Sequence, residues 1–127
     1  MKSVLKLISI SAVAASLSPM AVAMSASECI ATQKELSVEH RALSKAYKEL
    51  SKKGESAELI NDELVAAKEE SSISPQSAER AKILQVEFNE MKAEIGKLNS
   101  ELSQRSEAFN AAQKTFSAEC SRYLAKN

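Results

Sequence analysis

The stretch Ser71-Ser72-Ile73-Ser74-Pro75 decides the fold, because it is the clearest point at which a chain rich in Ala, Glu, Lys, Leu and Ser can reverse direction. Ser74 can cap a new helix, and Pro75 can occupy the first helical position, where the backbone N–H has no partner in any case. Residues 24–127 contain few other strong helix breakers. We therefore predict a turn at about residues 71–75, between helical arms at about 28–70 and 75–124.

Apolar residues recur at intervals of seven on both sides of this turn. The line in the first arm is Cys29, Leu36, Leu43, Leu50, Ala57 and Leu64. The second arm carries two interleaved lines: Leu84, Met91, Leu98, Arg105 and Ala112, and Ala81, Phe88, Ile95, Leu102, Phe109, Phe116 and Tyr123. Heptad spacing of this kind is typical of a coiled-coil seam. The predicted fold class is all-α, a long antiparallel helical hairpin.

The two cysteines support this topology, since Cys29 and Cys120 lie almost equidistant from Pro75. Folding the arms together about the turn sets Leu64 beside Leu84 and Cys29 beside Cys120. We therefore predict a disulfide that closes the open end of the hairpin. A redox-active pair would instead be expected to show the local C-x-x-C spacing.

Gly54 leaves a second topology to consider, because a glycine can end a helix. A reversal there would give an up-down-up bundle of three helices, in which Cys120 would lie tens of Å from Cys29. A kink near Gly54 fits the cysteines better, and Gly96 falls at nearly the same level of the opposite arm. The pairing of two glycines can also be coincidence.

Residues 1–23 have the pattern of a cleaved signal peptide: Lys2 and Lys6, an apolar run over 7–17, and an A-x-A site at Ala21-Val22-Ala23. The run is shorter than the roughly 20 residues of a membrane-spanning helix, so no retained membrane segment is expected. Glu28 directly before Cys29 argues against a lipoprotein. We predict a periplasmic or secreted protein with a single domain at residues 24–127.

The charges are balanced over the 127 residues, with 17 basic and 17 acidic side chains. Cleavage would remove Lys2 and Lys6 and leave a formal charge of −2, so nucleic acid is not an expected partner. The charges are interspersed, and Glu49–Lys53 and Glu101–Arg105 have the i, i+4 order of ion pairs on an exposed helix face.

Residues that could carry catalysis are sparse. His40 is the only histidine, and both cysteines are expected to be oxidised, which leaves no Cys-His pair and no second imidazole for a metal. The sequence has no glycine-rich phosphate loop and no His-Glu-x-x-His motif. We therefore expect no enzyme activity and no cofactor.

The strongest functional hint is an imbalance between the arms. A candidate interaction stripe on the second arm comprises Phe88, Ile95, Leu102, Phe109 and Phe116, and the register sets it against Asn61, Gly54, Tyr47, His40 and Gln33. Of these five, only Tyr47 can cover much apolar surface. The stripe has three interpretations: an ordinary seam within one chain, a homodimer interface, or a groove for apolar segments of other proteins.

This plan resembles that of envelope coiled-coil proteins, including the tentacles of a periplasmic chaperone, although this chain has no strand-rich body that could trimerise. The likeness concerns architecture and brings no binding residues. The expected function is a non-enzymatic periplasmic coiled-coil protein with a structural or adaptor role through protein contacts. The alternatives are a holdase for exported proteins and a small secreted inhibitor or toxin partner.

Overall fold

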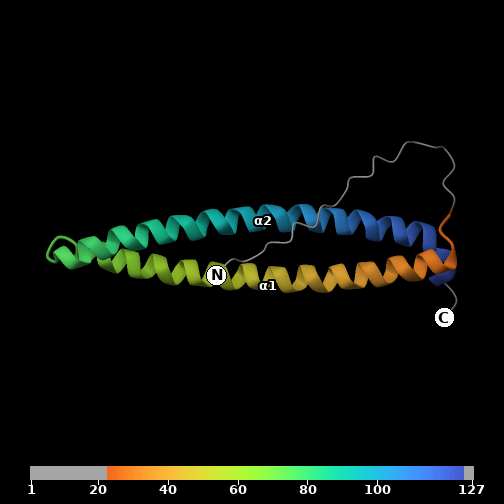
Figure 1. Ribbon diagram of the computed structural model, residues 1–127, viewed down its shortest axis with the longest axis horizontal. Helices are drawn as coiled ribbons and strands as arrows, with labels where there is room; N and C mark the ends of the chain where they lie inside the picture. Colours follow the sequence, from red (N-terminus) through yellow and green to blue (C-terminus); the bar gives the residue numbers. More distant parts are fainter. Residues whose placement is uncertain (1–22, 125–127) are drawn as a thin grey trace, which may run out of the picture.

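The computed structural model describes residues 23–124, and within this range it contains two helices and no strand. Helix α1 spans Ala26–Glu70 and helix α2 spans Pro75–Leu124. The helices lie side by side and antiparallel, joined by a tight turn at one end (Figure 1). The predicted all-α hairpin is therefore confirmed. The predicted signal peptide lies outside the described residues except for Ala23.

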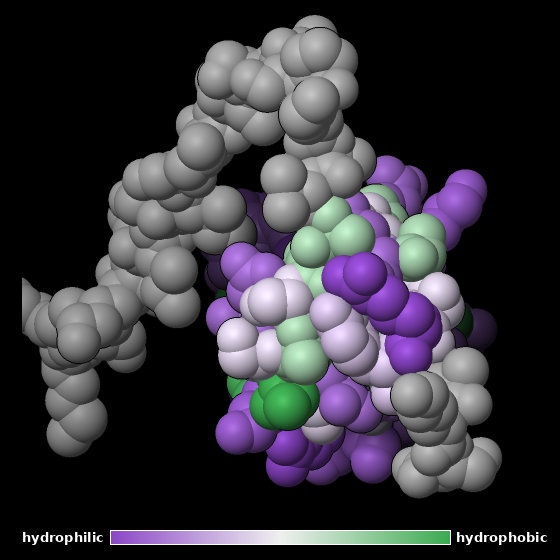
Figure 2. All heavy atoms as spheres, turned by 90° about the vertical axis from the view of Figure 1, so that its right-hand side faces the viewer, coloured by the Kyte–Doolittle hydropathy of each residue, from purple (hydrophilic) through white to green (hydrophobic). Residues whose placement is uncertain are grey.

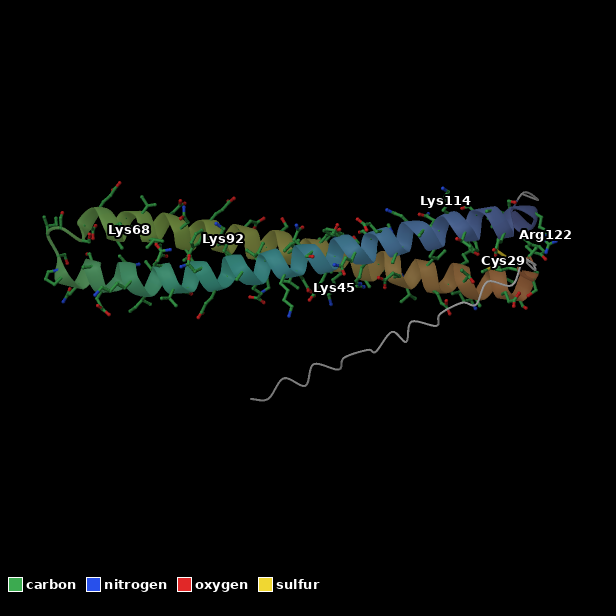
Figure 3. The ribbon with its side chains drawn as sticks, turned by 90° about the horizontal axis from the view of Figure 1, so that it is seen from above. Cys29, Lys45, Lys68, Lys92, Lys114 and Arg122 are labelled. Carbon is green, nitrogen blue, oxygen red and sulfur yellow. A yellow bond between two sulfur atoms is a disulfide. The ribbon has the colours of Figure 1, made fainter. Side chains whose placement is uncertain are left out.

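Both helices are long and uninterrupted. At about 1.5 Å per residue, the 45 residues of α1 and the 50 residues of α2 form a narrow rod. The helices cross in the view of Figure 3, as expected for two helices that share a heptad seam. Neither Gly54 nor Gly96 interrupts its helix, and neither has a positive φ. The alternative bundle of three helices is therefore wrong.

The turn is capped as its sequence predicts. The backbone N–H of Ser77 donates to the hydroxyl of Ser74 over 3.2 Å, and Pro75 is the first residue of α2. At the end of α1, the carbonyl of Glu70 accepts the backbone N–H of Ser74 over 3.0 Å. The Ser77 hydroxyl also donates to the Glu70 carboxylate, also over 3.0 Å. The turn thus satisfies its own polar groups and fixes where the chain reverses.

A capping box begins α1. The backbone N–H of Glu28 donates to the Ser25 hydroxyl, and the Glu28 carboxylate accepts the backbone N–H of Ser25 over 2.7 Å. This second bond favours the charged carboxylate and holds the pKa of Glu28 below its usual range. The first helical turn is thereby secured close to Cys29.

Buried apolar residues form a cluster at each end of the rod, and Leu43, Ala57 and Leu102 are buried between these clusters. Near the turn, Leu64, Ala67, Ala81 and Leu84 form one buried cluster, with Ile60 and Phe88 packed against it. At the open end, Cys29, Cys120 and Phe116 form a second cluster. The two cysteines are joined in a disulfide with Cα atoms 5.8 Å apart. The predicted closure of the hairpin and the pairing of Leu64 with Leu84 are confirmed.

Residues that precede Cys29 and follow Cys120 also make contacts at the open end. Met24 packs against the cysteine cluster, and its carbonyl accepts a hydrogen bond of 3.1 Å from Arg122. Arg122 and Cys29 lie at the same end of the rod in Figure 3. Seen end-on, this tip shows apolar and hydrophilic side chains next to one another (Figure 2). The open end is therefore a packed cap rather than a frayed pair of helix ends.

We expect Gly54→Ala and Gly96→Ala each to raise the free energy of unfolding by about 0.5 to 1 kcal/mol. A Cβ at either position would have no atom within 4 Å outside its own helical turn, so alanine gains helix propensity without a clash. Urea unfolding followed by circular dichroism measures the change. A loss of stability in either variant would show that the chain requires a glycine there.

Candidate functional site

The predicted stripe on α2 lies in the seam and faces α1. Leu102 and Phe116 are buried, with 4% and 9% of their surface exposed, and Phe88, Ile95 and Phe109 are half-buried. Two of the phenylalanines belong to the end clusters, Phe88 near the turn and Phe116 beside the disulfide. The stripe is therefore mainly part of the hairpin's own core. Its half-buried members remain reachable from the sides of the seam.

One flank of the seam carries the ion pairs that join the two helices. They are Glu63–Arg80 at 2.8 Å, Lys53–Glu94 at 2.9 Å and Glu39–Arg105 at 2.8 Å. Glutamates recur along this flank at spacings of seven or fourteen residues, at positions 28, 35, 49 and 63 of α1 and at 87, 94 and 101 of α2. This flank is consequently acidic.

On the opposite flank, the contacts between the helices join two neutral groups or one charged and one neutral group. Lys68 donates to the Gln85 amide oxygen over 2.7 Å, and the hydroxyls of Tyr47 and Ser106 are 3.0 Å apart. The rings of His40 and Phe109 have centroids 5.8 Å apart, as the predicted register requires. The two sides of the hairpin thus differ in charge.

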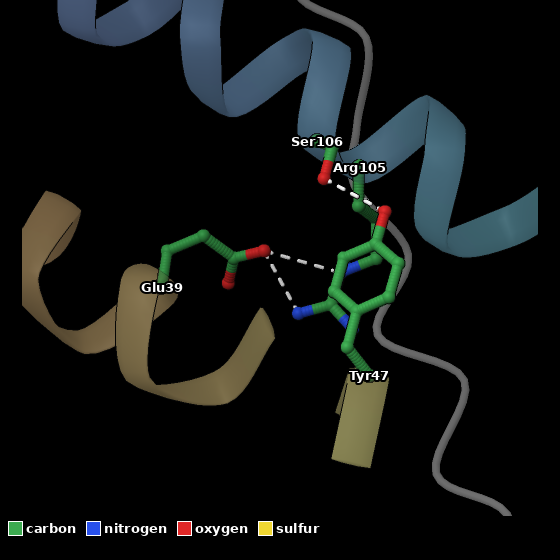
Figure 4. A network of polar contacts seen from close by, with 4 residues as sticks. All are labelled: Glu39, Tyr47, Arg105 and Ser106. Atoms are coloured by element: carbon green, nitrogen blue, oxygen red, sulfur yellow. Dashed lines mark hydrogen bonds and ion pairs between the residues drawn. The ribbon is translucent and has the colours of Figure 1, made fainter. Parts of the chain in front are cut away.

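Arg105 occupies a seam position where heptad spacing calls for an apolar residue. Its guanidinium donates two hydrogen bonds to one carboxylate oxygen of Glu39, at 2.8 and 3.1 Å, while the neighbouring Ser106 contacts Tyr47 (Figure 4). The Arg105 and Glu39 side chains are 44% and 40% exposed, so this pair adds little stability. Its geometric effect is to favour one register, as polar seam residues do in coiled coils.

The sequence predicted ion pairs within single helices, Glu49–Lys53 and Glu101–Arg105, and both predictions are wrong. Lys53 pairs with Glu94 rather than with Glu49, and Arg105 pairs with Glu39 rather than with Glu101. Arg105 lies on a seam line of α2, and Lys53 is half-buried one turn after the seam residue Leu50, so that both side chains reach the opposite helix. For Arg105 the signal was present in the sequence, because a charged residue on a seam line calls for a partner across the seam.

Beside the Glu39–Arg105 pair lies an open groove of about 630 Å³. Its floor is apolar and its rim carries charge; the lining residues are Thr32, Glu35, Leu36, Glu39, Arg105, Ala108, Phe109 and Ala112. A second groove of about 350 Å³ reaches Phe109 and Leu36 from the other flank, beside His40. Phe109 therefore borders a groove on each flank of the seam.

The described residues offer few features of a chemical site. Between residues 23 and 124, no group of three or more His, Cys, Asp or Glu side chains could hold a metal ion. In this part of the chain no helix is long and apolar enough to cross a membrane. No family model, curated protein or solved structure matches the chain. The functional argument therefore rests on shape and on surface chemistry.

Proposed function

We propose that this chain is a non-enzymatic protein of the bacterial periplasm that acts as a structural or adaptor rod through protein contacts. The observation that carries the proposal is a hairpin closed at both ends, by the Ser74-Pro75 turn and by the Cys29–Cys120 disulfide. Closure fixes the register, so that side chains along some 70 Å of surface, at about 1.5 Å per residue, keep constant spacing. Fixed spacing over a long surface suits an adaptor.

The proposed location rests on two features. Residues 1–23 have the pattern of an export signal, and disulfides persist in oxidising compartments such as the periplasm. The intact mass of the chain recovered from a periplasmic fraction would show whether it begins at Met24 and carries the disulfide.

A holdase that shields apolar segments of exported proteins is the second candidate. The groove that reaches Phe109, Leu36, Ala108 and Ala112 favours it, because an apolar floor with a charged rim suits an extended or helical apolar segment. The groove is nevertheless short compared with the rod. It serves one contact rather than the enclosure of a client.

An aggregation assay separates the two candidates. We expect light scattering from a thermally unfolding client protein to be unchanged, within about 20%, by a twofold molar excess of the disulfide-closed protein, because the apolar seam is largely occupied by the hairpin itself. Suppression of scattering by the wild type would contradict the structural role.

If the wild type suppresses scattering, two variants show whether the groove is responsible. Ala112 is exposed in the groove, and Ala111 is exposed outside it. Suppression that is lost in Ala112→Glu and retained in Ala111→Glu would establish the groove as a client site. A tight stoichiometric complex with one envelope protein, in place of broad weak binding, would instead favour an inhibitor or toxin partner.

A further inference from the structure

The outer face of α1 carries two blocks of opposite charge at heptad spacing. Lys34, Arg41 and Lys48 lie toward the open end, and Glu55, Asp62 and Glu69 continue the same column toward the turn. Each residue lies five positions after a seam residue of the Cys29 line, which is a rotation of about 140°. Asp62 also borders a groove that Phe88 and Lys92 of α2 line. All six are exposed, and none takes part in the ion pairs found among residues 23–124.

Exposed apolar side chains accompany this column. Val38, Leu59 and Val65 lie beside it on α1, Ile30 precedes it, and Ile73 lies at the turn; they are between 47% and 86% exposed. Apolar residues in contact with such a charge pattern are typical of an interface between helices. The column is therefore more than a solvated surface.

We propose that two copies of this chain associate through the outer faces of α1, antiparallel, about a two-fold axis that passes between Ser51 and Lys52. This axis sets Lys48 against Glu55 of the second copy, Arg41 against Asp62, and Lys34 against Glu69. The same operation brings Val38 to the level of Val65 and Ile30 to the level of Ile73. Each contact occurs twice, as an isologous interface requires.

The order of the charges favours an antiparallel second copy over other binding partners. A parallel copy would set cation against cation along the column, and an anionic membrane or a cationic peptide would match only one of the two blocks. Among these surfaces, the antiparallel copy alone neutralises all six side chains. The inference deepens the proposed contact role, and rests on it, by naming a second copy as one partner. Because exposed ion pairs are weak and screened by salt, association is reversible and salt-dependent.

Sedimentation equilibrium of the disulfide-closed mature protein at about 0.02 M and about 0.5 M salt tests the interface. We expect a dimer that weakens at the higher salt. Arg41→Glu should raise the dimer dissociation constant about tenfold or more, and Arg41→Glu combined with Asp62→Arg should restore it. Lys114→Glu is the matched control, because Lys114 is exposed and lies on α2, outside the proposed interface. It should leave dissociation unchanged.

Cross-linking tests the orientation. Ser51→Cys lies at the proposed axis, so a short bismaleimide should join two copies through this residue. Ser37→Cys should not cross-link to itself, because about 14 residues separate it from the axis, or some 20 Å along each helix. A monomer at every concentration, a dimer insensitive to Arg41→Glu, or cross-linking at both positions would overturn the proposal. A monomer would still leave the adaptor role open, since the aggregation assay tests that role independently.

Discussion

Replacement of Cys29 and Cys120 by serine is expected to lower the free energy of unfolding by about 4 to 5 kcal/mol. The disulfide spans a sequence separation of 91 residues, and in the chain-entropy model a loop of this size restricts the unfolded chain strongly. Within residues 23–124 the folded state has no further contact that could replace the disulfide, because the two arms meet in a single seam. Urea unfolding followed by circular dichroism at 222 nm would compare the double variant with the oxidised wild type.

Reductant supplies the control for this measurement. It should shift the wild-type midpoint toward that of the Cys29→Ser, Cys120→Ser variant and leave the variant itself unchanged. Equal midpoints for all samples would mean that the packing of Met24, Leu36 and Phe116 closes the open end without the covalent bond. In that case the disulfide would not be the feature that holds the register.

The fold was predictable because three separate features of the sequence agree. The heptad lines give helices with one seam, the Ser74-Pro75 pair gives the point of reversal, and the cysteine positions give the register. Each involves backbone periodicity or chain distance, quantities that the sequence order determines directly. The contact of His40 with Phe109 then follows from the register alone.

Side-chain pairing across the seam was harder to predict. Sequence spacing suggested that Lys53 and Arg105 pair within their own helices, whereas both reach across to glutamates. The exposed fraction of the Phe88 to Phe116 stripe also depends on how closely the arms approach, a distance that periodicity does not specify. The capping box at Ser25 and Glu28, by contrast, has a sequence signature that could have been read in advance.

The distribution of packing along the rod implies that stability is not uniform. Buried clusters lie at the turn and at the disulfide, while between them buried residues such as Leu43 and Leu102 alternate with half-buried ones such as Leu50. Truncation should therefore cost more at a buried residue of an end cluster, where it leaves a cavity, than at a half-buried residue of the middle. This asymmetry can be measured with one kind of substitution at two positions.

Leu64→Ala is expected to lower the free energy of unfolding by about 2 to 5 kcal/mol, and Leu50→Ala by markedly less. Leu64 is 3% exposed within the cluster near the turn, whereas Leu50 is half-buried in the middle of the seam and borders an open groove. Truncation at Leu64 therefore leaves a cavity, while truncation at Leu50 widens a space that water already reaches. The urea midpoint at constant m-value measures both changes.

Ile83→Ala provides the matched surface control, since Ile83 is 61% exposed on α2, and its effect should stay within about 0.5 kcal/mol. If Leu50→Ala cost as much as Leu64→Ala, the middle of the seam would be packed as tightly as the ends. The groove beside Leu50 would then have no room to adjust to a partner, and contacts would be confined to the grooves at Phe109 and to the outer faces of the rod. If the two costs differ as expected, the middle is the part of the seam that can adjust to a bound segment.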